Sequence, residues 1–221
     1  IAGASDASIV PLMLAGYQNM KALANGPLLP FDRRRNGFLV GEGAGAMLLE
    51  SLESAEKRHA KIYGEILGFN YGADAFDPVY FNPDDQTLAL TLNNLLKRSG
   101  LTASEIDYIN LHGTGTRAGD LYETNQLKKA FGPKAYQIPM SSTKSMTGHM
   151  LGATGAVEII ATLVAMNEGF IPPTIGLEEK DPACDLDYTP LKARDAKIER
   201  AISLSLGFGG HVAAIALGKA R

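Results

Sequence analysis

Short apolar runs alternate along this chain with segments whose apolar residues recur at helical spacing. The runs predict strands at residues 45–52, 61–69, 106–111, 138–141, 201–206 and 211–217. The other segments predict helices at 8–23, 54–59, 87–99, 120–131 and 152–167, with a further start at 102–105 capped by Ser104. Such alternation favours an α/β protein built from packed layers. The first helix is expected to bury one face.

Composition narrows the class of partner. The 221 residues carry a net charge of −3 and the densest basic run is Arg33 to Arg35, so a nucleic acid is not an expected partner. That run is typical of a solvated or loop-bracing patch, and it can also contact an acidic carrier. The single cysteine, Cys184, excludes an internal disulfide framework and a thiolate metal cluster. It suits the reducing cytoplasm, which is the expected location.

The hydropathy of the chain and its first residues indicate whether a membrane-spanning segment or a preceding segment is expected. No apolar run is long enough to cross a bilayer, and the first residues lack the basic start and apolar centre of a signal peptide. No membrane partner is expected. The chain starts with Ile1 rather than Met, in an apolar Ile-Ala-Gly that resembles a strand cut within the element. We therefore expect residues before Ile1.

His112 directly follows the strand predicted at 106–111 and opens a loop of small residues, Gly113 to Gly119. Proteins of the α/β class place reactive groups here, beyond the carboxyl ends of their strands. Two other interpretations stay open from these residues alone. The histidine can be held by backbone hydrogen bonds near a tight turn. Alternatively, the glycines can form a dinucleotide-binding turn, although their spacing is not G-x-G-x-x-G.

His149 lies just ahead of the helix predicted at 152–167, near the positive end of that helix. This position disfavours the imidazolium, and a neutral histidine that donates a hydrogen bond can stabilise an enolate. Lys144 and Glu158 form either a buried ion pair beside it or two ordinary surface charges. His59, in a charged helix, is expected in solvent. No H-x-x-x-H, C-x-x-C or acid cluster has ligand spacing, so no metal centre is predicted.

Two glycine-rich segments each allow two interpretations. The run Gly207-Phe208-Gly209-Gly210 joins two predicted strands, and its amides form either an oxyanion hole or a plain hairpin turn. In the run from Gly41 to Gly45 we favour the close packing of a strand over a ligand-binding loop.

Six segments occur in a characteristic order. They are PFDRRRNGFLVGEGAGAMLLE (30–50), NLHGTGTRAGD (110–120), SSTKSMTGHMLGATGAVE (141–158), PPTIGLE (172–178), CDLDYTP (184–190) and SLGFGGHVAAIAL (205–217). Together they resemble the β-ketoacyl-acyl carrier protein synthases of the discrete elongating type, such as synthase II. The resemblance covers nearly the whole chain.

The resemblance implies a thiolase-like, layered α-β-α-β-α fold of two similar halves. Residues 1–50 would form the end of the first half and residues 51–221 the complete second half. It also implies decarboxylative Claisen condensation of an acyl thioester with malonyl-acyl carrier protein, in fatty-acid or polyketide elongation. The implied partners are acyl carrier protein, malonyl and acyl thioesters, and a second copy in a homodimer. No cofactor is implied, because the phosphopantetheine belongs to the carrier protein.

The same resemblance assigns roles to the residues around the histidines. His112 and His149 would donate hydrogen bonds to the malonyl thioester oxygen and stabilise its enolate. Lys144 and Glu158 would order the site around His149. A pair of histidines implies elongation, because initiating relatives pair histidine with asparagine.

Further roles fall on two loops. Phe208, between Gly207 and Gly209, would gate access to the acyl cysteine, and its backbone N–H would contribute to an oxyanion hole. Thr114 and Thr116 would line the phosphopantetheine tunnel.

Some positions depart from the family pattern. The family's nucleophilic cysteine lies before the segment that resembles residues 1–24, and so falls outside these 221 residues. Cys184 is not its substitute, since nothing around it suggests an activated thiolate. Leu204 and Val212 stand where the family usually has asparagine, which bears on the gate loop.

Two other functions remain possible. The chain can be a non-catalytic partner, similar to a chain-length factor, that shapes the acyl pocket of a paired synthase. It can also be a nucleotide-binding α/β domain. The retention of His112, Lys144 and His149 favours the enzyme, because silent partners tend to lose these residues.

Overall fold

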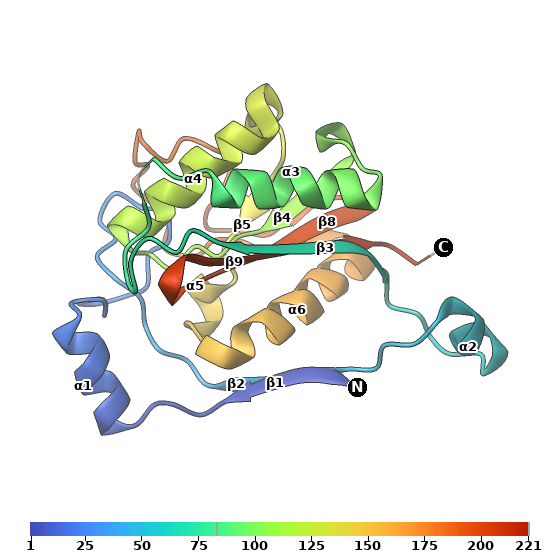
Figure 1. The fold of residues 1–221 in the computed structure, drawn as a ribbon, viewed down its shortest axis with the longest axis horizontal. Helices are drawn as coiled ribbons and strands as arrows, with labels where there is room; N and C mark the ends of the chain where they lie inside the picture. Colours follow the sequence, from blue (N-terminus) through green and yellow to red (C-terminus); the bar gives the residue numbers. More distant parts are fainter. Residues whose placement is uncertain (83, 221) are drawn as a thin grey trace.

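The computed structural model describes residues 1–82 and 84–220. Its elements form successive layers (Figure 1). The helices α3 (Thr87–Ser99) and α4 (Arg117–Phe131) cover one face of a five-stranded sheet, and α6 (Thr154–Glu168) packs against the other. A two-stranded sheet lies beyond α6. The predicted alternation of strands and helices therefore folds into stacked α and β layers.

β4 is an interior strand of the five-stranded sheet, with a neighbouring strand on each side. Its strands, in spatial order, are β3 (Glu65–Ala73), β9 (His211–Gly218), β8 (Arg200–Gly207), β4 (Tyr108–Asn110) and β5 (Met140–Ser141). β4 pairs in parallel with both β8 and β5, whereas β8 and β9 form the expected antiparallel hairpin through η4 (Phe208–Gly210). Every residue of β4 is buried, including the polar Asn110.

Small residues bring the two-stranded sheet close to α6. β1 (Ala2–Asp6) and β2 (Gly43–Met47) pair antiparallel, and β2 packs on α6. A Cβ added at Gly45 would lie 3.0 Å from Cδ1 of Ile160, and one at Gly43 would lie 2.6 Å from Sδ of Met150. The prediction of close packing between Gly41 and Gly45 is confirmed.

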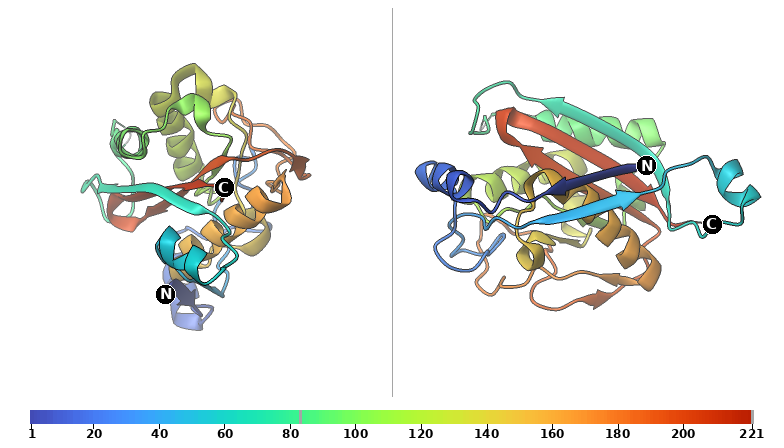
Figure 2. Two further views of the ribbon diagram at one scale, coloured as in Figure 1. Left: turned by 90° about the vertical axis from the view of Figure 1, so that its right-hand side faces the viewer. Right: turned by 90° about the horizontal axis from the view of Figure 1, so that it is seen from below.

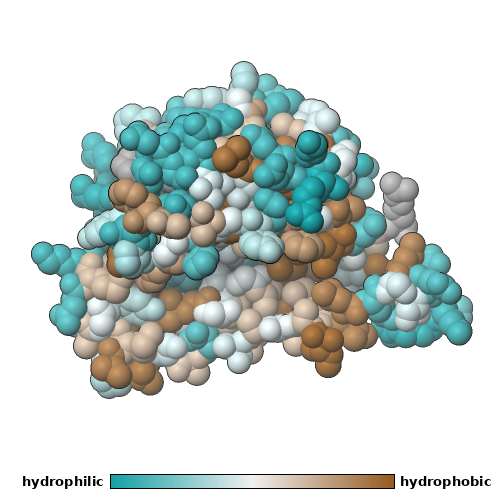
Figure 3. Space-filling model, in the orientation of Figure 1, coloured by the Kyte–Doolittle hydropathy of each residue, from teal (hydrophilic) through white to brown (hydrophobic). Residues whose placement is uncertain are grey.

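Two apolar clusters hold the layers together. Leu88, Leu92 and Leu95 of α3 are fully buried in the larger cluster, against the sheet and α4. The smaller cluster lies between α6 and the sheet and includes Met166 and Leu217. In contrast, Figure 3 shows mainly polar residues over α3 and α4 and a gathering of apolar residues over α1 and the β1–β2 pair.

Short elements complete the chain. They are α2 (Leu52–Lys57), η1 (Ala103–Glu105), η2 (Gly132–Tyr136), α5 (Lys144–Thr147), η3 (Leu151–Ala153), β6 (Phe170–Ile171) and β7 (Arg194–Asp195). Figure 2 shows α1 (Pro11–Asn19) and α2 projecting at opposite ends of the molecule. Within the described residues, no helix combines the length and apolar character needed to span a bilayer.

The structure corrects several sequence predictions. α1 covers less than residues 8–23 and buries none of its side chains; Leu12 is 82% exposed. Helical spacing fixes which side chains share a face, but not whether another element packs over it. The strand predicted at 45–52 ends at Met47, and the one predicted at 61–69 begins only at Glu65. Thr102, not Ser104, caps η1, because its side chain pairs reciprocally with Glu105 in a capping box.

Candidate active site

Two histidines that are distant in sequence face each other in the structure. His112 lies just past the carboxyl end of β4, and His149 lies in the turn between α5 and η3. Their ring centroids are 5.4 Å apart and their planes are inclined by 85°. Both rings are partly buried. The fold thus brings together the two residues that the sequence singled out.

Buried carboxylates brace the loop that carries His112. Glu123 on α4 accepts hydrogen bonds from the backbone N–H of His112 at 2.7 Å and of Gly113 at 2.8 Å. Asp120, one turn earlier, accepts from the N–H of Gly115 at 3.1 Å. Burial raises the pKa of Glu123 to about 7 and that of Asp120 to about 6. Sequence reasoning missed both residues, although their one-turn spacing directly after the loop was the available signal.

These bonds argue against a dinucleotide-binding turn. In such a turn, free backbone amides and a helix N-terminus receive a pyrophosphate. Here the amides of His112, Gly113 and Gly115 already donate to side-chain carboxyl groups, so they are not free to receive a phosphate. Position 113 requires glycine for a reason unrelated to phosphate binding. Its φ is 40°, and an added Cβ would lie 2.5 Å from Cβ of Ser142.

Backbone and side-chain contacts fix His149. Its N–H donates to the carbonyl of Leu39 at 2.7 Å, and its own carbonyl accepts from the N–H of Gly41 at 2.9 Å. The ring nitrogen Nδ1 accepts from the N–H of Leu151 at 3.2 Å. Since a backbone N–H can only donate, Nδ1 is unprotonated and the neutral ring carries its proton on Nε2. The ring of Phe38 packs edge-on at a centroid distance of 5.5 Å.

Lys144 and Glu158 form the buried ion pair, rather than two surface charges. Lys144 Nζ lies 2.7 Å from Oε1 of Glu158, and their side chains are 0% and 1% exposed. Thr143 Oγ1 donates a second, longer hydrogen bond to the same carboxylate oxygen, at 3.4 Å. The pair fixes a positive charge close to the histidines.

The electrostatics keep both histidines neutral at pH 7. Burial, and then the Lys144 ammonium, lower the pKa of His149 to about 3; the carboxylate of Asp6 acts in the opposite direction. The same two causes, in the same order, lower the pKa of His112 well below 6.5. A pair of neutral imidazoles can donate hydrogen bonds to a developing oxyanion without themselves carrying charge.

Thr114 and Thr116 follow His112 on the same loop. Their hydroxyl oxygens are 3.2 Å apart, and Thr114 is buried. Contact with a phosphopantetheine arm stays a prediction for these two residues.

The loop from Gly207 to Gly210, which carries Phe208, is hydrogen-bonded to the segment that follows β3. Gly209 has a φ of 75°, and its N–H donates to the carbonyl of Pro78 at 2.8 Å; the N–H of Asp74 donates to the carbonyl of Gly210 at 3.2 Å. The Gly209 amide is therefore engaged. Phe208 at the tip is 48% exposed. Its gating role and the oxyanion-hole role of its amide stay predictions, as do the parts assigned to Gly207 and Gly209.

The basic run at residues 33–35 makes ion pairs within the protein, and its contact with an acidic carrier stays a prediction. Arg34 pairs with Asp32, and Arg35 with Asp181, so the basic run braces loops. Cys184 is buried, and its burial raises the pKa of the thiol, which does not suit a nucleophile.

Among residues 1–82 and 84–220, no three His, Cys, Asp or Glu side chains are grouped so as to hold a metal ion.

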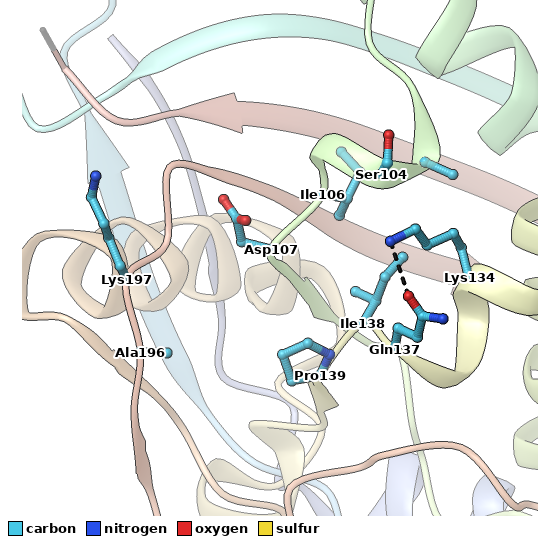
Figure 4. A pocket seen from close by; sticks show the side chains of 10 residues that line it. Ser104, Ile106, Asp107, Lys134, Gln137, Ile138, Pro139, Ala196 and Lys197 are labelled. Carbon is cyan, nitrogen blue, oxygen red and sulfur yellow. Dashed lines mark hydrogen bonds between the residues drawn. The ribbon is translucent and has the colours of Figure 1, made fainter.

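A polar hollow of 330 Å³ is lined by residues that precede β4 and β5 (Figure 4). Its lining includes Ile106 and Asp107, which precede β4, and Pro139, which precedes β5. His112, in contrast, follows β4, at the opposite end of that strand. Lys134 in this hollow donates to Gln137 at 3.0 Å. The hollow therefore does not belong to the histidine site.

Comparison with protein families decides which group this arrangement belongs to. Residues 1–55 match the family model described as the beta-ketoacyl synthase N-terminal domain, and residues 63–178 match the beta-ketoacyl synthase C-terminal domain. The chain belongs to the beta-ketoacyl synthase family. The predicted membership is confirmed, and the histidine site lies within the C-terminal match.

Similar proteins include a 3-oxoacyl-[acyl-carrier-protein] synthase and a polyketide beta-ketoacyl synthase. The chain is 46% identical to 3-oxoacyl-[acyl-carrier-protein] synthase 2 of Synechocystis sp., over 99% of this chain and 54% of that protein. It is 43% identical to the oxytetracycline polyketide putative beta-ketoacyl synthase 1 of Streptomyces rimosus, over 98% and 52% of the two chains. The chain thus spans about half the length of the curated relatives it matches.

A solved structure confirms the predicted fold class. A ketosynthase bound to a hexaketide, in complex with a type II polyketide synthase acyl-carrier protein, superposes with a TM-score of 0.95 at 34% identity. The match covers 98% of this chain and 55% of that one. The thiolase-like layered α/β fold of the beta-ketoacyl synthases is therefore present here. The division at residue 50 between two halves remains a prediction.

Proposed function

We propose that this chain is part of a 3-oxoacyl-[acyl-carrier-protein] synthase that joins an acyl thioester to malonyl-acyl carrier protein with loss of CO2. The observation that carries the proposal is the pair of facing neutral histidines, His112 and His149, beside the buried Lys144–Glu158 ion pair. Family membership supports the same reaction.

The chemistry explains why two neutral donors are needed. The bond between the malonyl α-carbon and its carboxylate breaks, CO2 leaves, and the electron pair passes into the thioester to form an enolate. Negative charge develops on the thioester oxygen, where the N–H groups of His112 and His149 donate hydrogen bonds. The enolate carbon then attacks the acyl thioester carbonyl, a new carbon–carbon bond forms, and the acyl-carrying thiolate leaves.

The other site residues support these steps in the proposal. Lys144 and Glu158 hold the surroundings of His149, and the Lys144 ammonium adds to burial in favouring its neutral ring. Thr114 and Thr116 line the tunnel for the phosphopantetheine arm, and Phe208 gates the approach to the acyl group. The acyl-carrying cysteine lies outside the 221 residues, because Cys184 is buried with a raised pKa.

Partners and location follow from the proposed chemistry and from relatives. The carrier protein is the proposed partner, as in the ketosynthase complex of the solved relative, and it brings the phosphopantetheine, so the synthase itself needs no cofactor. We also propose a homodimer and, from the single free cysteine, a cytoplasmic location.

Product formation tests the proposal. The full-length protein, given malonyl-acyl carrier protein and an acyl donor, is expected to release one CO2 for each β-ketoacyl product detected by mass spectrometry. The 221 residues alone are expected to form no product, because the acyl-carrying thiol is absent from them. Product from the 221 residues alone would refute the placement of the thiol. Product only after addition of a separate synthase would instead favour a partner similar to a chain-length factor.

A further inference from the structure

The side chain of Thr154 contacts the Nδ1 side of the His149 ring, opposite the Nε2 atom. Thr154 is the first residue of α6 and is 3% exposed. Its hydroxyl oxygen lies 3.1 Å from Nδ1 of His149, the same nitrogen that accepts from the N–H of Leu151. Leu151 has a φ of 44°, a left-handed conformation that is uncommon for a residue with a side chain. This conformation accompanies the alignment of its N–H with the ring.

The direction of the threonine bond follows from that backbone donor. Because Leu151 N–H donates to Nδ1, this nitrogen carries a lone pair, and the Thr154 hydroxyl can only donate to it. Nδ1 therefore accepts two hydrogen bonds. Protonation of Nδ1 would oppose both donors, and the only ring proton is left on Nε2.

We propose that Thr154 is a positioning residue that, together with the Leu151 N–H, fixes His149 as the neutral Nε2–H tautomer and sets the orientation of its ring. The functional part of this inference rests on the proposed function, in which Nε2–H donates to the enolate oxygen. The buried hydroxyl holds one edge of the ring while Phe38 packs against it, so the opposite edge is presented in one orientation.

The charges around His149 act in both directions. The Lys144 ammonium, paired with Glu158, disfavours the imidazolium, whereas Asp6 favours it. Asp6 also accepts a hydrogen bond from the N–H of Gly152 at 3.1 Å, which keeps its carboxylate near the ring. His112, the other titratable group facing the ring, is itself neutral. The Thr154 hydroxyl acts in the same direction as Lys144, against the pull of Asp6.

Two substitutions separate the hydroxyl from the shape of the side chain. Thr154→Val keeps the branched shape and removes the donor, whereas Thr154→Ser keeps the donor and removes a methyl group. In the full-length protein labelled with ¹⁵N-histidine, with His149→Gln used to assign the resonance, Thr154→Val is expected to move Nδ1 toward the value of an unbonded nitrogen. The pKa of the ring should rise by about one unit.

Kinetics give a second readout. For Thr154→Val, kcat of CO2 release from malonyl-acyl carrier protein is expected to fall roughly three- to tenfold with little change in KM, and Thr154→Ser should restore it. An unchanged Nδ1 resonance and pKa in Thr154→Val would overturn the proposal, as would identical behaviour of the Ser and Val variants. If the wild-type protein released no CO2, the proposed function would fail, and the ¹⁵N spectra alone would decide the role of Thr154.

Discussion

Alanine in place of His149 is expected to slow the release of CO2 from malonyl-acyl carrier protein by about 10²–10³-fold, because the enolate loses one of two preorganised hydrogen-bond donors. His112→Ala should have an effect of the same order. The double variant should lose little more than either single variant, since the two rings face each other and act on one oxygen. Release of labelled CO2 by the full-length variants measures this.

Two control variants sharpen the histidine experiment. His59→Ala removes an exposed histidine beside α2 and should leave CO2 release unchanged. His149→Asn keeps a side-chain N–H donor and should retain more activity than His149→Ala. If His149→Ala and His112→Ala both released CO2 at the wild-type rate, neither ring could be the donor to the enolate.

Lys144→Met is expected to lower the free energy of unfolding by about 3–5 kcal/mol, because it leaves the Glu158 carboxylate buried without its cation. Activity should also fall, since in the proposed function the Lys144–Glu158 pair orders the surroundings of His149. Urea unfolding of the full-length protein, with CO2 release measured in parallel, reports both effects.

Comparison variants distinguish this effect from general sensitivity to lysine loss. Lys197→Met breaks an exposed pair with Glu199, at 3.2 Å, and should change stability by less than about 1 kcal/mol. The double variant Lys144→Met/Glu158→Leu should regain much of the stability without regaining activity, because apolar residues can replace a buried ion pair. A loss below about 1 kcal/mol for Lys144→Met would mean that Glu158 does not need its partner.

The order of strands and helices was predictable because each element follows local rules of spacing and of breaking residues. The run at 106–111 became β4, and the helices predicted at 87–99 and 152–167 became α3 and α6, which are capped by Gly100 and Gly169 in left-handed conformations. The exposure of α1 was not predictable, because periodicity within a helix says nothing about which element covers it.

Site residues whose side chains have few common roles, such as histidine, could be predicted from the sequence. Residues that act through a contact between distant segments could not, because that contact is visible only in the folded structure. A histidine after a strand and a lysine near a glutamate were already suggestive. The one-turn spacing of Asp120 and Glu123 after the loop was a signal, but acids are also common in a first helical turn for the helix dipole alone. Only the fold showed that their carboxyl groups accept from the amides of the His112 loop. Thr154 carried no signal, since only the turn at Leu151 brings its hydroxyl to His149.

The central claim is that the enolate-forming half of the reaction belongs to these 221 residues, whereas the acyl-carrying thiol does not. The most direct measurement is CO2 release from malonyl-acyl carrier protein by the full-length protein after its reactive thiol has been alkylated. We predict that CO2 release continues while β-ketoacyl product disappears, because the two histidines stabilise the enolate without the thiol. If CO2 release stopped together with product formation, the histidine pair would not be sufficient for decarboxylation and the claim would be contradicted.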